Sequence, residues 1–211
     1  SIVSDRNEAT TFAVLGIITK GDVTVCPIPE NYLKTFINVI EKIKGGTEKI
    51  GENSWRFFYK GPLISLDIVT APHPGFMTDW QPNWAVLMTQ AAGKSLIHER
   101  VFENRFSYVD ELIKMGAKIE YSSPIVQNPE SFYIFNYDKG KEHKQAITVY
   151  GPQHLHNGVL TIADLRAGAT LAIAALFAEG ESIINGASIL ERGYENFVEK
   201  ITSLGGDIKK V

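Results

Sequence analysis

Three segments of the chain carry apolar residues at nearly every position of a helix. They cover residues 11–19, 83–92 and 165–178. A helix that is apolar all round is buried on every side, so we predict that these segments are three helices of one core. The longest apolar stretch, residues 167–178, is about half as long as the ~20 residues that a membrane-spanning helix needs. The pattern there predicts a core helix rather than a membrane span.

Each core helix is followed by a short β-rich run and then by a helix with one apolar stripe. Stripes at helical spacing indicate helices that pack one face against the core. Glycines follow the stripes, where a helix ends in a left-handed cap. The stripes are Leu33, Phe36, Ile37, Ile40 and Ile43; Phe106, Val109, Leu112 and Ile113; and Tyr194, Phe197, Val198, Ile201 and Leu204, with glycines at Gly45, Gly46, Gly116, Gly205 and Gly206. The expected strands are residues 22–26, 55–59, 63–70, 95–98 and 182–185.

These elements recur in the same order in three segments, each of which opens on an aspartate and ends in a strand after the second helix. The glycine at the end of each apolar helix segment (Gly21, Gly93 and Gly180) follows the aspartate after 16, 14 and 16 positions. The period is too long for a solenoid. We therefore predict a single α/β domain over residues 1–211, an inside-out barrel with helices inside and sheets outside. Its three helix–sheet units span about residues 5–70, 79–160 and 164–211.

The second unit contains additional chain between residues 122 and 161. Residues 138–144, with the sequence DKGKEHK, are polar throughout. Segments of this kind lie on the surface, so we expect an exposed hairpin or loop there rather than a binding element.

The composition is that of an ordinary globular protein, with 211 residues, 44% hydrophobic and 21% charged. A formal net charge of -3 supplies no basic field for nucleic acid or an anionic membrane, so we expect neither as a partner. Residues 1–11 lack the pattern of a secretory signal. The single cysteine, Cys26, favours a reducing compartment, and we expect the cytoplasm. Because Cys26 ends a predicted strand, we interpret it as a buried structural thiol.

The three units open on Asp5, Asp79 and Asp164, and two of these aspartates are followed by Arg6 and Arg166. If the core helices run parallel, their amino ends meet and present free N–H groups and aligned dipoles to an anion. Guanidinium groups bind phosphate and carboxylate as well. This predicts a local anion site. The alternative is that each aspartate is only a helix N-cap.

Asp79 lies near the end of an unusual segment, residues 70–81, with the sequence TAPHPGFMTDWQ. Pro72 and Pro74 restrict the residues before them to extended conformations, so the chain that reaches Asp79 is stiff. A carboxylate held on a stiff loop suits general-base catalysis. The alternative is a rigid loop that only turns the chain.

Motifs for a metal or a bound cofactor are weak or missing in the sequence. His154 and His156 share one face of a strand, but the spacing of the sequence offers no third ligand. There is no P-loop and no dinucleotide-binding glycine motif. We therefore expect no metal and no cofactor.

Four segments resemble the family of UDP-N-acetylglucosamine 1-carboxyvinyltransferases, and the resemblance covers nearly the whole chain. They are residues 70–81, 101–117 (VFENRFSYVDELIKMGA), 163–171 (ADLRAGATL) and 192–211 (RGYENFVEKITSLGGDIKKV). The resemblance implies the inside-out α/β fold that this family shares with the shikimate-pathway enolpyruvyl transferase. The implied reaction moves the enolpyruvyl group of phosphoenolpyruvate to the 3′-hydroxyl of UDP-N-acetylglucosamine and releases phosphate. This is the first committed step of peptidoglycan synthesis.

The resemblance also implies roles for individual residues. Asp79 matches the aspartate that contacts the sugar hydroxyl and is proposed as its base. Val101 matches a backbone contact to the sugar nucleotide. Asp164, Arg166 and Arg192 match residues at the reaction centre, where Arg192 contacts phosphoenolpyruvate.

Two further arginines match family positions whose role stays open at this point. Arg6 matches an arginine that faces the cleft, and Arg105 matches the arginine of the FENR motif. Both are candidates for substrate binding. The alternative is that they form interdomain or structural ion pairs.

The chain resembles only the later of the two similar domains that family members contain. The resemblance therefore implies the N-terminal domain of the same enzyme as a partner. That domain supplies a Lys-Asn pair for phosphoenolpyruvate and a mobile loop with the cysteine or aspartate that acts as general acid, and Cys26 does not match it. Two alternatives remain: a relative of the shikimate-pathway enzyme, and a sugar-nucleotide-binding module without catalysis.

Overall fold

The computed structural model describes residues 3–210 of the chain. Its helices are α1 (Arg6–Ile18), α2 (Glu30–Lys42), the 3₁₀ helix η1 (Thr78–Trp80), α3 (Gln81–Met88), α4 (Val109–Lys114), α5 (Pro129–Phe132), α6 (Leu165–Phe177), α7 (Ala187–Leu190) and α8 (Phe197–Ser203). Its strands are β1 (Asp22–Val25), β2 (Gly46–Gly51), β3 (Ser54–Phe58), β4 (Leu63–Ile64), β5 (Ile68–Val69), β6 (Ala91–His98), β7 (Ile119–Ser122), β8 (Ala146–Gly151), β9 (Val159–Thr161) and β10 (Ile183–Asn185).

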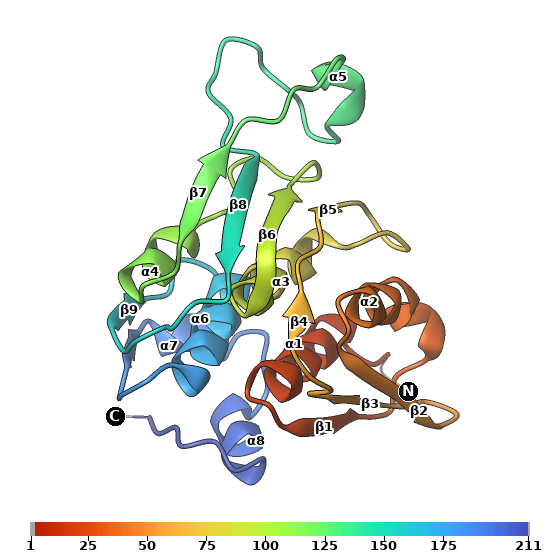
Figure 1. Ribbon diagram of the computed structural model, residues 1–211, viewed down its shortest axis with the longest axis vertical. Coiled ribbons are helices and arrows are strands. Elements are labelled where there is room, and N and C mark those ends of the chain that lie inside the picture. The colour runs from red at the N-terminus through yellow and green to blue at the C-terminus, as the bar shows by residue number, and fades with distance from the viewer. Residues whose placement is uncertain (1–2, 211) are drawn as a thin grey trace.

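Three helices, α1, α3 and α6, pack against one another in the middle of the fold (Figure 1). Every residue of α3 is buried, as are residues 9–18 of α1 and 167–174 of α6. This all-round burial is what their apolar composition predicts. The expectation of three core helices is confirmed.

The strands form three separate sheets around these helices. β1, β3 and β2 make an antiparallel sheet that packs on α1. A second, mixed sheet has the strand order β4, β6, β8, β7. β5 also pairs with β6, at residues of β6 that follow those paired with β4. This sheet packs on α3. β9 and β10 pair in parallel. The fold is mixed α/β, and within residues 3–210 the strands do not close into one continuous barrel sheet.

The amphipathic helices confirm most of their predicted stripes, but Ile113 and Leu204 are exposed, and one cap differs. In α2 the buried positions Leu33, Phe36, Ile37 and Ile40 are those of the stripe. Gly116 and Gly205 take the expected left-handed conformation after α4 and α8, with φ of 92° and 91°. After α2 the left-handed residue is Lys44, with φ 67°, rather than Gly45 or Gly46. Gly45 instead provides space, since an added Cβ would lie 2.6 Å from Ile40.

The strand expected over residues 63–70 is interrupted, since β4 ends at Ile64 and β5 begins at Ile68. Three further expectations about local structure are wrong. The helix predicted over residues 83–92 ends at Met88 and β6 begins at Ala91, because small residues fit either pattern and the pairing of Ala91 and Ala92 with β4 decides. Residues 206–210 form no strand, and Val211 lies outside the described residues. Cys26 is exposed rather than buried. The alternation of β1 explains this, since Val23 and Val25 point inward and the next residue points outward.

The additional chain between β7 and β8 forms an arm that projects beyond the end of the mixed sheet, seen at the top of Figure 1. It contains the four-residue helix α5, which the sequence pattern did not predict. Residues 138–144 have neither helix nor strand and are exposed except for His143. The prediction of an exposed loop is confirmed.

Candidate active site

Asp79 lies where the amino-terminal ends of α1, α3 and α6 come together. Its Oδ1 accepts a hydrogen bond of 2.6 Å from Arg105 Nη2. Its Oδ2 accepts hydrogen bonds of 3.1 Å from Asn7 Nδ2 and 3.3 Å from Arg166 Nη2. Asn7 is the second residue of α1, Arg166 is the second residue of α6, and Arg105 precedes α4. These contacts show the convergence of helix starts that the repeat predicts.

The ion pairs at Asp79 are partly buried. The side chains of Asp79, Arg105 and Arg166 are 22%, 26% and 15% exposed. Charges in such positions are less screened by salt than charges on an open surface. Their remaining exposure leaves the cluster accessible to a ligand.

Buried aromatic side chains anchor the stiff segment before Asp79 in the core. Trp80 is 1% exposed and Phe76 is 5% exposed. Their ring centroids lie 5.6 Å apart, and Phe76 also lies 5.4 Å from the ring of Trp84 in α3. A hydrogen bond of 2.8 Å from Ala71 N to the carbonyl of Phe76 closes the loop. The neighbours of Asp79 are therefore anchored in the core while its carboxylate faces the helix starts.

A buried carboxylate, Glu99, is connected to the Asp79 cluster through hydrogen bonds. Glu99 is fully buried and accepts hydrogen bonds of 2.7 Å from the hydroxyls of Thr70 and Thr78. Thr78 in turn accepts a hydrogen bond of 3.1 Å from Arg105 Nη1. Glu99, Thr78, Arg105 and Asp79 therefore form one connected chain of polar groups. Glu99 was not predicted from the sequence. The one feature that could have indicated it is its position as a charged residue directly after a predicted strand.

Val101 is half-buried at the start of the loop that carries Arg105. Its N–H donates to Glu99 Oε1 at 2.7 Å, and the N–H of Phe102 donates to the same oxygen at 3.1 Å. The Val101 N–H is thus already used within the chain. A backbone contact from Val101 to a ligand would have to come from its carbonyl.

Asp5 and Asp164 are N-caps. Asp5 Oδ1 accepts from the N–H groups of Asn7 and Glu8 at the start of α1. Asp164 Oδ1 accepts from the N–H groups of Arg166 and Ala167 at the start of α6. Both aspartates therefore cap their helices, as the N-cap pattern predicts. The other oxygen of Asp164 accepts a hydrogen bond of 2.5 Å from the hydroxyl of Ser107.

A buried set of hydrogen bonds joins the three core helices beneath the cluster. Asn83 of α3 donates to Thr11 Oγ1 of α1 at 2.9 Å and accepts from Thr170 Oγ1 of α6 at 2.7 Å. The hydroxyls of Thr11 and Tyr194 lie 2.9 Å apart, and Arg166 Nη1 donates to Tyr194 at 3.4 Å. Burial raises the pKa of Tyr194, which keeps its phenol protonated. These bonds fix the relative position of the helix starts.

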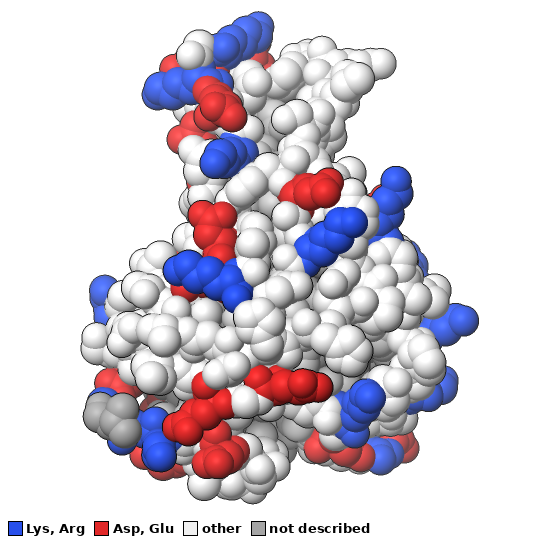
Figure 2. All heavy atoms as spheres, turned by 60° about the vertical axis from the view of Figure 1, so that its left-hand side comes forward, with Lys and Arg blue, Asp and Glu red and all other residues white. Residues whose placement is uncertain are grey.

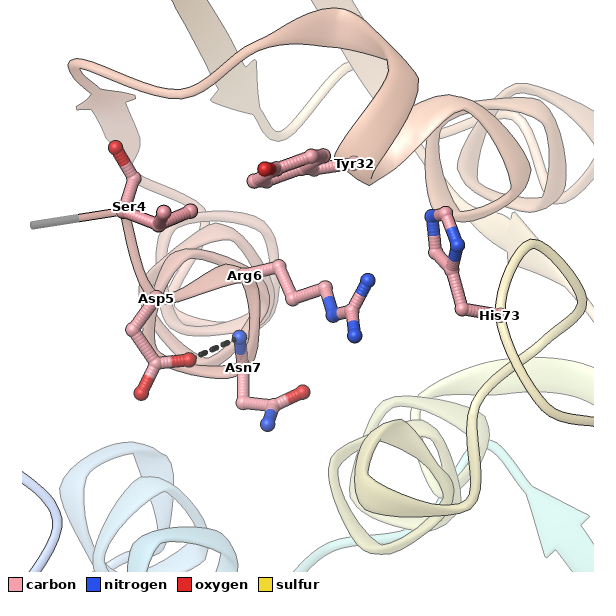
Figure 3. Close-up of a pocket in the computed structure, with 7 residues that line it drawn as sticks. Ser4, Asp5, Arg6, Asn7, Tyr32 and His73 are labelled. Atoms are coloured by element: carbon pink, nitrogen blue, oxygen red, sulfur yellow. Dashed lines mark hydrogen bonds between the residues drawn. The ribbon is translucent and has the colours of Figure 1, made fainter.

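Arg6 faces a different hollow beside the cluster. An open pocket of about 460 Å³ is lined by the first turn of α1 and by Tyr32 and His73. The guanidinium of Arg6 points into it between these two side chains (Figure 3). Its Cζ lies 5.8 Å from the centroid of the Tyr32 ring. Within residues 3–210 Arg6 forms no ion pair. Arg105, by contrast, forms an ion pair with Asp79 within the chain.

Arg192 lies outside the Asp79 cluster. It follows α7 in a turn and is exposed. Within the described part of the chain its side chain makes no hydrogen bond or ion pair with another residue. Among the predicted site residues, Asp79, Arg105 and Arg166 are therefore brought into direct contact and Arg192 is not.

The surface carries charges of both signs. On the face in Figure 2, Lys and Arg side chains lie among Asp and Glu side chains, with a broad uncharged area between them. Nowhere in residues 3–210 do three or more His, Cys, Asp or Glu side chains gather closely enough to hold a metal ion. In the same residues no helix has the length and apolar character needed to cross a membrane.

Sequence comparisons place these residues in a known group. A family model described as EPSP synthase (3-phosphoshikimate 1-carboxyvinyltransferase) matches residues 1–201. Relatives named UDP-N-acetylglucosamine 1-carboxyvinyltransferase are 36% identical in Protochlamydia amoebophila and 38% identical in Chlamydia abortus. The matches cover 100% and 98% of this chain but 44% and 46% of those proteins. The chain thus spans less than half the length of these relatives.

Solved structures show the same fold. The enolpyruvyl transferase NikO from Streptomyces tendae superposes with a TM-score of 0.80 at 23% identity, covering 99% of this chain and 44% of that one. The EPSP synthase from Acinetobacter baumannii gives a TM-score of 0.69 at 16% identity, covering 99% of this chain and 48% of that one. At these identities the likeness concerns the fold alone. The match to the family model over nearly the whole sequence carries the assignment: this chain belongs to the EPSP synthase family.

Proposed function

We propose that this chain is the part of an enolpyruvyl transferase that holds the catalytic base. The reaction moves the enolpyruvyl group of phosphoenolpyruvate to the 3′-hydroxyl of UDP-N-acetylglucosamine and releases phosphate. The observation that carries the proposal is the Asp79 carboxylate held between Arg105 and Arg166 at the meeting of three helix starts. The names of the curated relatives support this acceptor over the shikimate-pathway one.

The charges of the cluster suit this chemistry. Phosphoenolpyruvate carries a phosphate and a carboxylate, and guanidinium groups bind both in a forked geometry. Helix amino ends add backbone N–H groups and the positive end of their dipoles. Arg105 and Arg166 are the two arginines already beside the proposed base, and Arg6 and Arg192 are available from either side. We assign Arg192 to phosphoenolpyruvate, as the family resemblance implies.

Asp79 is the proposed general base. As the 3′-oxygen bonds to the carbon of phosphoenolpyruvate that carries the phosphate, its proton passes to the Asp79 carboxylate. In the same addition the double bond opens and its methylene carbon takes a proton from the general acid. Loss of a proton from that carbon then re-forms the double bond as the bond to the phosphate oxygen breaks and phosphate leaves. Both oxygens of Asp79 are occupied by donors in the unliganded chain. Binding of the anionic substrate draws an arginine away and leaves an oxygen for the hydroxyl.

Asp164, Val101 and Arg6 complete the proposed site. Asp164 keeps one oxygen for capping and offers the other, now bonded to Ser107, toward the reaction centre. The carbonyl of Val101 contacts the sugar nucleotide. The pocket beside Arg6, with the aromatic ring of Tyr32 on its wall, receives an anionic part of a substrate.

The same proposal includes the finer architecture. The three helix–sheet units form an inside-out domain, and the active site lies between this domain and an N-terminal companion domain of the same enzyme. That companion supplies the general acid and the rest of the phosphoenolpyruvate site. The reaction belongs to cell-wall synthesis, and we place it in the cytoplasm. The length of the curated relatives supports a second domain of similar size.

Phosphate release tests the proposal. This chain is combined with a separately produced remainder of the Protochlamydia amoebophila relative, a mixture called here the reconstituted enzyme. Phosphate release from phosphoenolpyruvate is measured with UDP-N-acetylglucosamine, and in parallel with shikimate 3-phosphate. We expect release in the mixture with the sugar nucleotide and none from either part alone.

Two other outcomes would overturn the proposal in different ways. Release with shikimate 3-phosphate alone would identify a relative of the enzyme after which the family is described. Binding of UDP-N-acetylglucosamine without phosphate release, by parts shown to be folded and associated, would identify a binding module.

A further inference from the structure

The arm between β7 and β8 is tied to the loop that carries Arg105. Ile134 N, in the arm, donates to the carbonyl of Arg100 at 2.8 Å. His143 Nδ1 lies 3.4 Å from a carboxylate oxygen of Glu103. The backbone N–H of Lys144 donates to Asn104 Oδ1 at 3.0 Å. The arm therefore contacts the loop at several successive residues.

The strongest of these connections is Gln145, the last residue before β8. It is 2% exposed. Its Oε1 accepts a hydrogen bond of 2.7 Å from the N–H of Asn104. Its Nε2 donates to the carbonyls of Glu99 at 3.0 Å and Phe102 at 2.8 Å. The side-chain amide thus bonds to both ends of the turn between Glu99 and Asn104.

Asn104 transmits this constraint to Arg105, the next residue. Asn104 adopts a left-handed conformation with φ 51°, which is uncommon for a residue other than glycine. Gln145 and Lys144 hold its N–H and its side-chain oxygen, respectively. On the other side, Gln81 Nε2 donates to the carbonyl of Arg105 at 3.3 Å. The backbone around Arg105 is therefore fixed from two directions.

We propose that Gln145 is a positioning residue for the reaction, acting through Asn104 to aim the guanidinium of Arg105 at Asp79. The inference rests on the proposed function, because the direction of the Arg105 guanidinium affects turnover only if Asp79 takes part in the reaction. The side chain of Gln145 makes its hydrogen bonds to Asn104, Glu99 and Phe102, and none to the side chains of Asp79 or Arg105. A displacement of a catalytic group by about 1 Å can lower a rate by about a hundredfold. Loss of Gln145 therefore acts on turnover rather than on nucleotide binding.

The main test replaces Gln145 by the uncharged side chain closest in shape, in the reconstituted enzyme. Gln145→Met removes all three hydrogen bonds and keeps the volume. We expect kcat to fall by about tenfold to a hundredfold, while the KM for UDP-N-acetylglucosamine changes by less than about twofold. The matched control is Thr148→Val in β8, which removes the hydrogen bond of 2.6 Å to Ser122 and lies away from the loop. The control is expected to keep the wild-type kcat.

A double-mutant cycle separates positioning from a general loss of structure. If Gln145 acts through Arg105, Gln145→Met has less than about a twofold further effect on kcat in an Arg105→Ala background. Independent, multiplying effects of the two substitutions would overturn the proposal. So would a wild-type kcat for Gln145→Met in folded protein.

A second variant keeps the proposal testable if Gln145→Met does not fold. Asn104→Gly retains the N–H and the left-handed conformation but removes the side-chain oxygen that Lys144 holds. Asn104 is exposed. We expect a smaller fall in kcat with the same unchanged KM, and an unchanged kcat would contradict the proposal. Absence of turnover in the wild-type mixture would instead count against the proposed function.

Discussion

Asp5 and Asp164 start their helices by capping them, whereas Asp79, at the corresponding place before α3, does not. The first two aspartates give one oxygen to backbone N–H groups of the first turn. Before α3 the chain makes the 3₁₀ helix η1, and the N–H groups of Trp80 and Gln81 bond to the carbonyls of Met77 and Thr78. The carboxylate of Asp79 is therefore left for Arg105, Arg166 and Asn7.

The difference separates stability from chemistry within one repeated pattern. A capping aspartate stabilises its helix by roughly 1 kcal/mol. A carboxylate that bonds only to side chains is able to exchange its partners when a ligand arrives. Of the three helix starts, the one with the 3₁₀ turn carries the proposed base.

The largest expected effect is that of Asp79→Asn in the reconstituted enzyme. We expect kcat to fall by about 10²–10⁴, because the base is removed. Affinity for UDP-N-acetylglucosamine is expected to change only a few-fold, as most contacts remain. Steady-state kinetics and calorimetric titration measure the two quantities. An unchanged kcat would remove Asp79 from the mechanism.

Arg192→Ala tests an arginine outside the cluster against those within it. Loss of a charged hydrogen bond costs about 1.5–3 kcal/mol, so the KM for phosphoenolpyruvate is expected to rise by roughly tenfold to a hundredfold. The KM for UDP-N-acetylglucosamine is expected to stay nearly constant. Equal changes in both KM values would count against the role assigned to Arg192.

Asp5→Ala is the stability counterpart of Asp79→Asn. Loss of the cap is expected to cost about 1 kcal/mol of unfolding free energy, which lowers the Tm by about 2–4 °C in a chain of this size. Thermal unfolding followed by circular dichroism measures this shift. A fall in kcat as large as that of Asp79→Asn would place Asp5 with the catalytic groups and contradict its role as a cap alone.

The smallest effect is expected for Ser107→Ala. This variant tests Asp164, which is intermediate between the cap Asp5 and the proposed base Asp79. One oxygen of Asp164 caps α6, and the other bonds to Ser107. Loss of a neutral hydrogen bond is worth about 0.5–1.5 kcal/mol, so we expect kcat to fall by about threefold as the carboxylate loses its orientation. If kcat equals the wild-type value, Asp164 belongs with Asp5 as a cap alone.

The sequence predicts the core helices and the meeting of their starts, since both follow from apolar pattern and repetition. It does not predict how each aspartate is used. Asn7 and Asp79 are 72 positions apart, and Arg166 and Asp79 are 87 apart. Such pairings leave no local signal. Glu99 and Gln145 are missed for the same reason, because their partners lie on other segments.

Errors in the predicted local structure arise where tertiary pairing decides. The small residues Ala91 and Ala92 continue a helical pattern, but pairing with β4 makes them part of a strand. Cys26 directly follows β1, and the alternation of that strand points it outward. Neither the strand pairing of Ala91 and Ala92 nor the exposure of Cys26 can be predicted from composition alone.

The most direct measurement is a crystal structure of the reconstituted enzyme with UDP-N-acetylglucosamine bound. The account predicts that the 3′-hydroxyl lies within hydrogen-bond distance, about 2.6–3.2 Å, of an Asp79 carboxylate oxygen. It also predicts that an arginine partner has moved off that oxygen. A bound sugar whose 3′-hydroxyl lies elsewhere, with Asp79 still held by Arg105 and Arg166, would contradict the assignment of the base.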